Sequence, residues 1–101
     1  MTTLNVTIES ILVRDRELKT ADVDDGVVVL SVRAGAYFGF NRVASEIWNM
    51  LGESCRVGRI FDVLAERHDV DAETLARDVM PFLQRLIEER LVRVTVPDQV
   101  R

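Results

Sequence analysis

Short apolar stretches in the first half of the chain follow the two-residue repeat of β-strands. Residues 27–32 are the clearest case, because five of the six are Val or Leu. Residues 18–23 and 36–40 read as strands before and after it. Asp25–Gly26 is typical of a hairpin turn, in which the glycine would adopt a positive φ, and residues 33–35 form the second turn. The pattern predicts a three-stranded antiparallel meander with its third strand at an edge.

Three later segments have apolar residues at the i, i+3, i+4, i+7 spacing of amphipathic helices. The first follows Asn41, a good N-cap, and ends before Gly52; the second spans residues 57–67; the third begins after Asp71. Pro81 lies inside the third helix and is expected to kink it. The three apolar stripes are Ala44, Ile47, Trp48 and Leu51; Val57, Ile60, Phe61 and Leu64; and Leu75, Val79, Phe82, Leu83, Leu86 and Ile87.

The two ends of the chain have weaker patterns. Val6 and Ile8 alternate with Thr7 and favour a strand, whereas the charged residues 14–19 are expected to be solvated. Residues 91–96 predict a short last strand, and a frayed tail follows. Strands followed by helices predict an α+β fold, with a three-stranded antiparallel sheet and three helices in a winged helix-turn-helix-like arrangement.

Aromatic side chains concentrate around the third predicted strand. On that strand Phe38 and Phe40 share one face, and Tyr37 and Gly39 share the other. We interpret Phe38, Phe40 and Trp48 as core residues, while Tyr37 fits a core role and a binding role equally. An exposed strand edge also has unpaired N–H and C=O groups, to which another chain can add as a strand.

Composition and charge narrow the classes of function. The 101 residues suit one domain spanning 1–101, and a net charge of −4 with Lys19 as the only lysine opposes nucleic-acid binding. The longest apolar run, residues 27–30, is too short to span a membrane, and the N-terminal residues do not resemble a secretory signal. The single cysteine, Cys55, cannot form an internal disulfide, which fits a reducing cytoplasm.

Residues suited to catalysis or to metal binding are sparse. His68 is the only histidine, and there is no Cys/His cluster for zinc or an iron–sulfur centre. Cys55 would need His68 as its base to act as a nucleophile; a partly buried thiol and a histidine at a helix end are the favoured interpretations. Gly35 and Gly39 lack the context of a phosphate loop, and the acidic residues 22–25 lack the EF-hand pattern. We therefore expect a binding protein, with no enzymatic activity, metal or cofactor.

Three consecutive motifs resemble those of the PqqD-like family, which takes its name from a pyrroloquinoline quinone synthesis protein. They are residues 27–32 (VVVLSV), 35–41 (GAYFGFN) and 47–51 (IWNML). The likeness extends over about residues 18–95. It implies a winged helix-turn-helix-like domain that recognises the leader segment of a ribosomally made precursor peptide and hands the precursor to a protease, cyclase or radical enzyme. The Tyr-Phe-Gly-Phe-Asn segment is most similar to the lasso-peptide branch, in which the partner is a leader-cleaving protease.

The resemblance also implies where the peptide binds. The leader would add as a strand to the backbone of Ala36, Tyr37, Phe38 and Gly39. Residues of the third helix would line the groove, with an arginine facing acidic leader residues; these residues are Leu75, Val79, Met80, Leu83 and Arg77. A purely core role is the alternative for the apolar members, since the helix needs one face for the core.

Two positions depart from the family pattern, and a proline lies in the expected groove wall. Phe40 stands where Leu is usual, which is a conservative change. Arg56 stands where Ser or Thr often caps the second helix, so that Ser54 is expected to substitute. Pro81 would bend the helix that forms one wall of the groove.

Two other functions remain as alternatives. A winged helix-turn-helix is also a frequent fold of DNA-binding regulators, although the acidic charge argues against that function. The same strand edge could instead pair with a second copy of the chain to form a homodimer.

Overall fold

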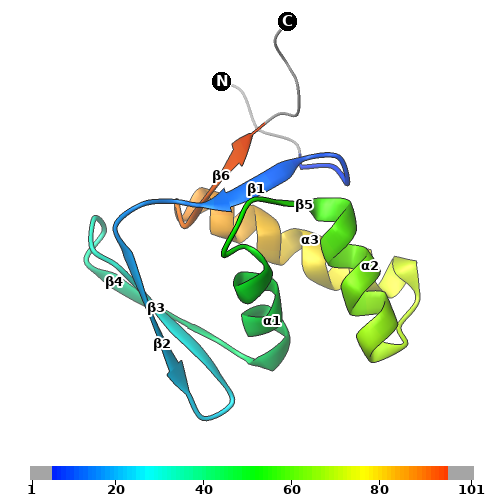
Figure 1. Ribbon diagram of the computed structural model, residues 1–101, viewed down its shortest axis with the longest axis horizontal. Coiled ribbons are helices and arrows are strands. Elements are labelled where there is room, and N and C mark those ends of the chain that lie inside the picture. The colour runs from blue at the N-terminus through cyan, green and yellow to red at the C-terminus, as the bar shows by residue number, and fades with distance from the viewer. Residues whose placement is uncertain (1–5, 96–101) are drawn as a thin grey trace, which may run out of the picture.

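The computed structural model describes residues 6–95, which form an α+β fold with two small antiparallel sheets and three helices (Figure 1). The predicted tail from Pro97 onward lies outside the described residues. In chain order the elements are β1 (Ile11–Arg14), β2 (Leu18–Val23), β3 (Gly26–Ser31), β4 (Ala36–Phe40), α1 (Arg42–Met50), β5 (Cys55–Arg56), α2 (Val57–His68), α3 (Ala72–Glu88) and β6 (Val92–Thr95).

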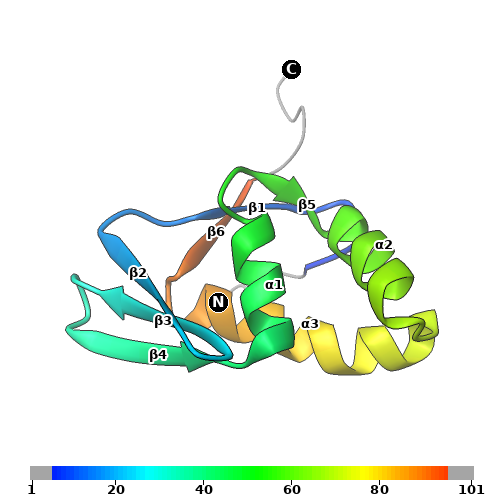
Figure 2. The same ribbon diagram turned by 60° about the horizontal axis from the view of Figure 1, so that its bottom comes forward.

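The sheet β2-β3-β4 is the predicted meander. β3 lies in the centre and pairs antiparallel with β2 along its whole length and with β4 from Val27 to Ser31. Alternate residues of β3, namely Val27, Val29 and Ser31, are buried on the face that packs toward α1 (Figure 2). This alternation confirms the period-two interpretation, and β4 is an edge strand as predicted.

Gly26 has a different role from the one expected. The tight loop consists of Asp24 and Asp25, while Gly26 pairs with Val23 inside the sheet. A Cβ atom at Gly26 would collide with the backbone carbonyl of Phe40. The glycine is therefore needed because two stretches of backbone approach closely, and the positive φ, 65°, occurs at Gly35 in the next turn.

The second sheet, β5-β1-β6, was not predicted. β1 lies between two very short strands, and Leu12 at its centre pairs with Cys55 on one side and Val94 on the other. The strand predicted around Val6–Ile8 is wrong, because Ile8 lies in a turn closed by a hydrogen bond of 3.0 Å from the Ser10 N–H to the Thr7 carbonyl. The predicted last strand is confirmed as β6, although it joins this second sheet.

All three helices form where their stripes predict. Side-chain oxygens cap two of them: Asn41 accepts from the Ala44 N–H at the start of α1, and Asp71 accepts from the Thr74 N–H at the start of α3, each at 2.9 Å. α3 continues through the exposed Pro81 to Glu88, so the proline does not end the helix.

The N-terminus of α2 is satisfied in an unexpected way. Arg56 is the N-cap and makes no side-chain capping bond, and Ser54 does not replace it. The carbonyls of Ser10 and Ile8 instead accept from the N–H groups of Val57 and Gly58, at 2.9 and 2.8 Å. Backbone from the segment before β1 thus supplies the acceptors that a side chain usually supplies.

Arg14 is packed against the core, although its charged surroundings predicted a solvated segment. Its guanidinium lies 4.4 Å from the centre of the Trp48 ring and donates a hydrogen bond of 2.7 Å to the Trp48 carbonyl. Burial lowers the pKa of Arg14, but guanidinium groups remain protonated at neutral pH. The cation therefore covers the fully buried indole and bonds a carbonyl at the end of α1.

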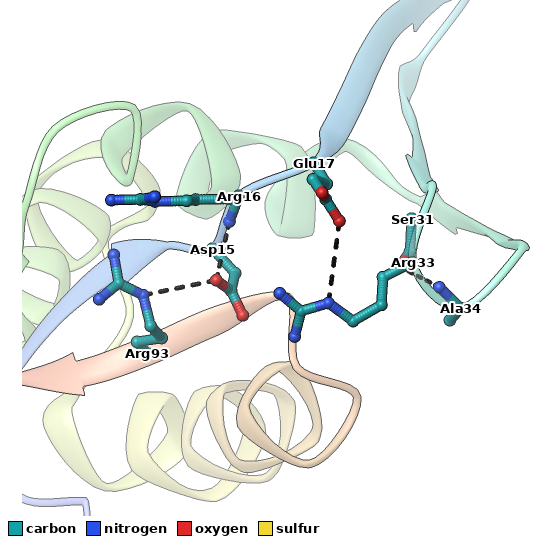
Figure 3. A network of polar contacts seen from close by, with 7 residues as sticks. All are labelled: Asp15, Arg16, Glu17, Ser31, Arg33, Ala34 and Arg93. Carbon is teal, nitrogen blue, oxygen red and sulfur yellow. Dashed lines mark hydrogen bonds and ion pairs between the residues drawn. The ribbon is translucent and has the colours of Figure 1, made fainter.

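Ion pairs surround the connection between the two sheets (Figure 3). Arg93 Nε on β6 lies 3.5 Å from Asp15 Oδ1, and Arg33 Nε lies 3.9 Å from Glu17 Oε1. Glu17 also accepts from the Val32 N–H through its carbonyl, at 3.0 Å. The Arg33–Glu17 pair is exposed on both sides and adds little stability, so the backbone bond from Val32 contributes more to holding Glu17 beside the β3–β4 turn.

Candidate functional site

The outer edge of β4 has no strand neighbour within residues 6–95. Its residues alternate between half-buried side chains, Phe38 and Phe40, and exposed positions, Tyr37 and Gly39. Tyr37 is 74% exposed, so it is not a core residue. A free edge of this kind can hydrogen-bond an added strand along its main chain.

A hollow of about 390 Å³ lies between this edge and α3. Tyr37, Phe38, Gly39 and Phe40 line one side, and the start of α1 and Leu91 complete it. The wall opposite β4 comes from the C-terminal half of α3, through Phe82, Arg85 and Leu86, and from the C-cap residue Glu89. Apolar and charged side chains thus meet beside exposed strand backbone, which is the setting that a bound peptide requires.

Phe40 holds the two sides of the hollow together. Its ring makes edge-to-face contacts with Trp48 of α1, at 5.6 Å between ring centres, and with Phe82 of α3, at 5.4 Å. Trp48 is fully buried and donates from Nε1 to the Thr20 hydroxyl at 3.2 Å. The spacing between β4 and α3 is therefore set by a packed aromatic row rather than by a flexible loop.

The rim of the hollow on α3 carries both signs of charge. Arg85 Nε lies 3.8 Å from Glu89 Oε2, one helical turn away, and the two side chains are 70% and 42% exposed. Such an exposed pair contributes little to stability, so each partner can exchange its contact for one with a bound molecule.

None of the α3 residues expected in the groove lines the hollow beside β4. Leu75, Val79 and Leu83 are buried in the core, with exposed fractions of 6, 4 and 0%. Met80 is half-buried against the same core, and Arg77 is exposed, yet neither lines the hollow beside β4. The residues that line this hollow opposite β4 are instead Phe82, Arg85, Leu86 and Glu89. The signal in the sequence was the position of Phe82 at the margin of the predicted stripe.

Cys55 and His68 do not form a catalytic pair. Burial raises the pKa of the Cys55 thiol, although the nearby Arg59 opposes the shift, and its sulfur contacts the Arg56 carbonyl at 3.6 Å. His68 Nε2 lies 3.0 Å from Glu46 Oε1 and joins the end of α2 to α1. Both side chains are thus accounted for by structural contacts.

Residues 6–95 contain no group of three or more His, Cys, Asp or Glu side chains placed to hold a metal ion. None of their helices is long and apolar enough to cross a membrane.

Comparison with known proteins assigns the chain to a family. The model of the family described as coenzyme PQQ synthesis protein D (PqqD) matches residues 26–92, so the chain belongs to this family. Its fold is also that of a solved structure described as TbiB1 in complex with the TbiA(beta) leader peptide. The two chains are 34% identical, with a TM-score of 0.74, over 80% of this chain and 94% of TbiB1. A comparison with curated proteins finds no match.

Proposed function

We propose that this protein is an adaptor that binds the leader segment of a ribosomally made precursor peptide and presents it to a maturation enzyme. The observation that carries the proposal is the free edge of β4 beside the hollow on α3. Membership of the PqqD family and the likeness to TbiB1, which was solved with a leader peptide, support it. The sequence motifs that resemble the lasso-peptide branch favour a lasso peptide or a related natural product.

The leader would add as a fourth strand to the backbone of Ala36, Tyr37, Phe38 and Gly39. Main-chain hydrogen bonds would supply affinity for any extended peptide, and alternate side chains would enter the hollow. Phe82 and Leu86 offer an apolar wall there. In place of Arg77, we assign Arg85 as the cation that meets an acidic leader residue.

An amide-resolved NMR titration with the leader peptide encoded beside this gene tests the proposal. Strand addition should shift the amides of residues 36–40 and of α3 residues 82–89. Absence of shifts at millimolar peptide would refute leader binding for that peptide. Shifts confined to residues 75–80 would restore the groove expected from the sequence and would contradict the geometry described above.

Two arginines of α3 form a matched pair of variants. Arg85→Ala should weaken binding of an acidic leader a few-fold, because an exposed ion pair contributes about 1 kcal/mol or less. Arg77→Ala also removes an exposed positive charge from the same helix. Because Arg77 lies nearer the start of α3 and does not line the hollow, the variant should leave the dissociation constant unchanged. Equal effects of the two variants would show that only the total charge matters.

The adaptor would act without chemistry of its own and would increase the local concentration of precursor at its partner, most simply a leader-cleaving protease. Purified protein should leave the mass of the precursor unchanged. Adding it to the partner enzyme should lower the KM for the precursor more than it raises kcat. Cleavage or modification of the precursor by the adaptor alone would refute this role.

The two alternatives can be tested with the same material. DNA binding has little physical support, because the exposed residues of α3 include Glu73, Asp78 and Glu88 beside its arginines and the net charge is −4. A gel-shift experiment at low salt should therefore show no complex. A homodimer through β4 would compete with the leader, so sedimentation should show the dimer disappear on addition of peptide.

A further inference from the structure

A second hollow adjoins the first at the end of β4. It has a volume of about 380 Å³ and lies between the first turns of α1 and the middle of α3. Asn41, Ala44 and Phe82 line both hollows. The two are therefore parts of one groove that bends around the Phe82 ring, and the second part has no role in the strand addition proposed above.

Apolar side chains form most of the second hollow. Ile47 and Val79, with exposed fractions of 1 and 4%, belong to the core and form its base. Val43 is 40% exposed although it is apolar, and it stands at the rim. Covering Val43 would remove apolar surface from water, so a bound apolar side chain would be stabilised there.

One carboxylate marks the rim. Asp78 lines the hollow from α3, is exposed, and forms no ion pair with any residue from 6 to 95. The hollow therefore combines an apolar base with a single unpaired negative charge. Its chemical complement is an apolar side chain with a Lys or Arg nearby.

The direction of the added strand says which part of a peptide arrives there. An added strand that runs antiparallel to β4, as β3 does, begins where β4 ends, at Phe40 and Asn41. Residues that precede the paired segment of the peptide would thus continue past Asn41 into the second hollow.

We propose that the second hollow binds the leader residues immediately N-terminal to the strand-forming segment, taking an apolar side chain onto Ile47 and Val79 and a basic one beside Asp78. This inference rests on the proposed function and extends it. The leader would be recognised at two subsites, a strand-forming one that tolerates many sequences and a side-chain pocket that selects among them.

The test uses two synthetic peptides from the leader encoded beside this gene: the complete leader, and a version that starts at the first residue paired with β4. The complete leader should bind about tenfold more tightly, corresponding to about 1.4 kcal/mol for one buried apolar side chain. Val43→Glu should remove that advantage and leave the truncated peptide unaffected. Ile8→Glu is the matched control, because Ile8 is also exposed and apolar but lies beside α2.

A charge exchange provides a second readout that does not depend on Val43. Asp78→Lys should weaken binding of the complete leader, and changing the leader's basic residue to Glu should restore it. A leader without Lys or Arg in this region would overturn the assignment of Asp78.

The outcomes separate this inference from the proposed function. If the complete and truncated peptides bind equally, the second hollow is not a subsite, although leader binding stands. If neither peptide binds, the proposed function itself fails. A concentration-dependent dimer that Val43→Glu abolishes would assign the hollow to a second copy of the chain and overturn the inference.

Discussion

At the scale of single residues, the fold depends on a few side chains whose roles come from their neighbours in space. Gly26 is a glycine because the Phe40 carbonyl occupies the position of a Cβ atom. Gly39, on the neighbouring strand, has no atom within 4 Å of the corresponding position. The two glycines of one sheet therefore differ in what they tolerate, although the sequence presents both simply as glycines in strands.

Gly26→Ala should destabilise the protein by about 1–3 kcal/mol, as overpacking against rigid backbone does. Gly39→Ala is the control and should change the free energy of unfolding by about 0.5 kcal/mol or less, because its Cβ would lie in open space. Urea denaturation followed by Trp48 fluorescence measures both. Equal effects would mean that the sheet adjusts around Gly26.

At the scale of elements, side-chain caps decide where α1 and α3 begin. Asp71 caps α3, its carboxylate accepts from the Thr74 N–H at 2.9 Å, and hydrogen bonding to Thr74 lowers the pKa of Asp71. A group whose pKa is lower in the folded state stabilises that state above its unfolded pKa. The contribution is lost as the pH falls through the lower, folded value.

Asp71→Asn should therefore make the stability of the protein less dependent on pH under acidic conditions. Asn also caps helices but does not titrate, so the variant keeps a cap at every pH. Between about pH 5 and pH 2, the Tm of the native protein should fall more than that of the variant, because aspartate in an unfolded chain has a pKa of about 3.9 and the bonds to Thr74 hold the pKa of Asp71 below that in the folded protein. If the Tm of both proteins falls equally over this range, protonation of Asp71 does not change the stability of the fold. Glu73→Gln, in the same first turn, is the control for loss of negative charge.

At the scale of the whole molecule, the segment before β1 connects parts that are distant in the sequence. Val6 is buried against the core, and the carbonyls of Ile8 and Ser10 cap α2 through Gly58 and Val57. β1 then joins β5 and β6 into one sheet. The end of the molecule away from β4 therefore depends on these first residues.

Removal of residues 1–10 should destabilise the protein by about 2 kcal/mol or more, since the cut removes a buried valine and two helix-capping acceptors. The amides of Val57 and Gly58 should then exchange with solvent as fast as frayed helix ends. Amides of β3 should lose protection only as much as the global stability falls. Unchanged protection at Val57 and Gly58 would refute the capping role.

Local patterns in the sequence determined the meander β2-β3-β4, the three helices and the caps at Asn41 and Asp71. Each of these follows from periodicity or from a side chain that bonds its own neighbourhood, so no distant residue is needed to predict it. The family motif likewise lies within one continuous stretch and indicated leader binding at the third strand.

Only the tertiary structure decided the second sheet, the capping of α2 and the wall of the groove. β1 and β5 show no repeat in the sequence, and the predicted strand β6 joins them in one sheet because Leu12 pairs with both Cys55 and Val94. The position of β4 along α3 depends on how Phe40 packs between Trp48 and Phe82. That contact places Phe82–Glu89 beside the hollow at β4, since a helical stripe shows which residues are apolar but not which neighbour each one faces.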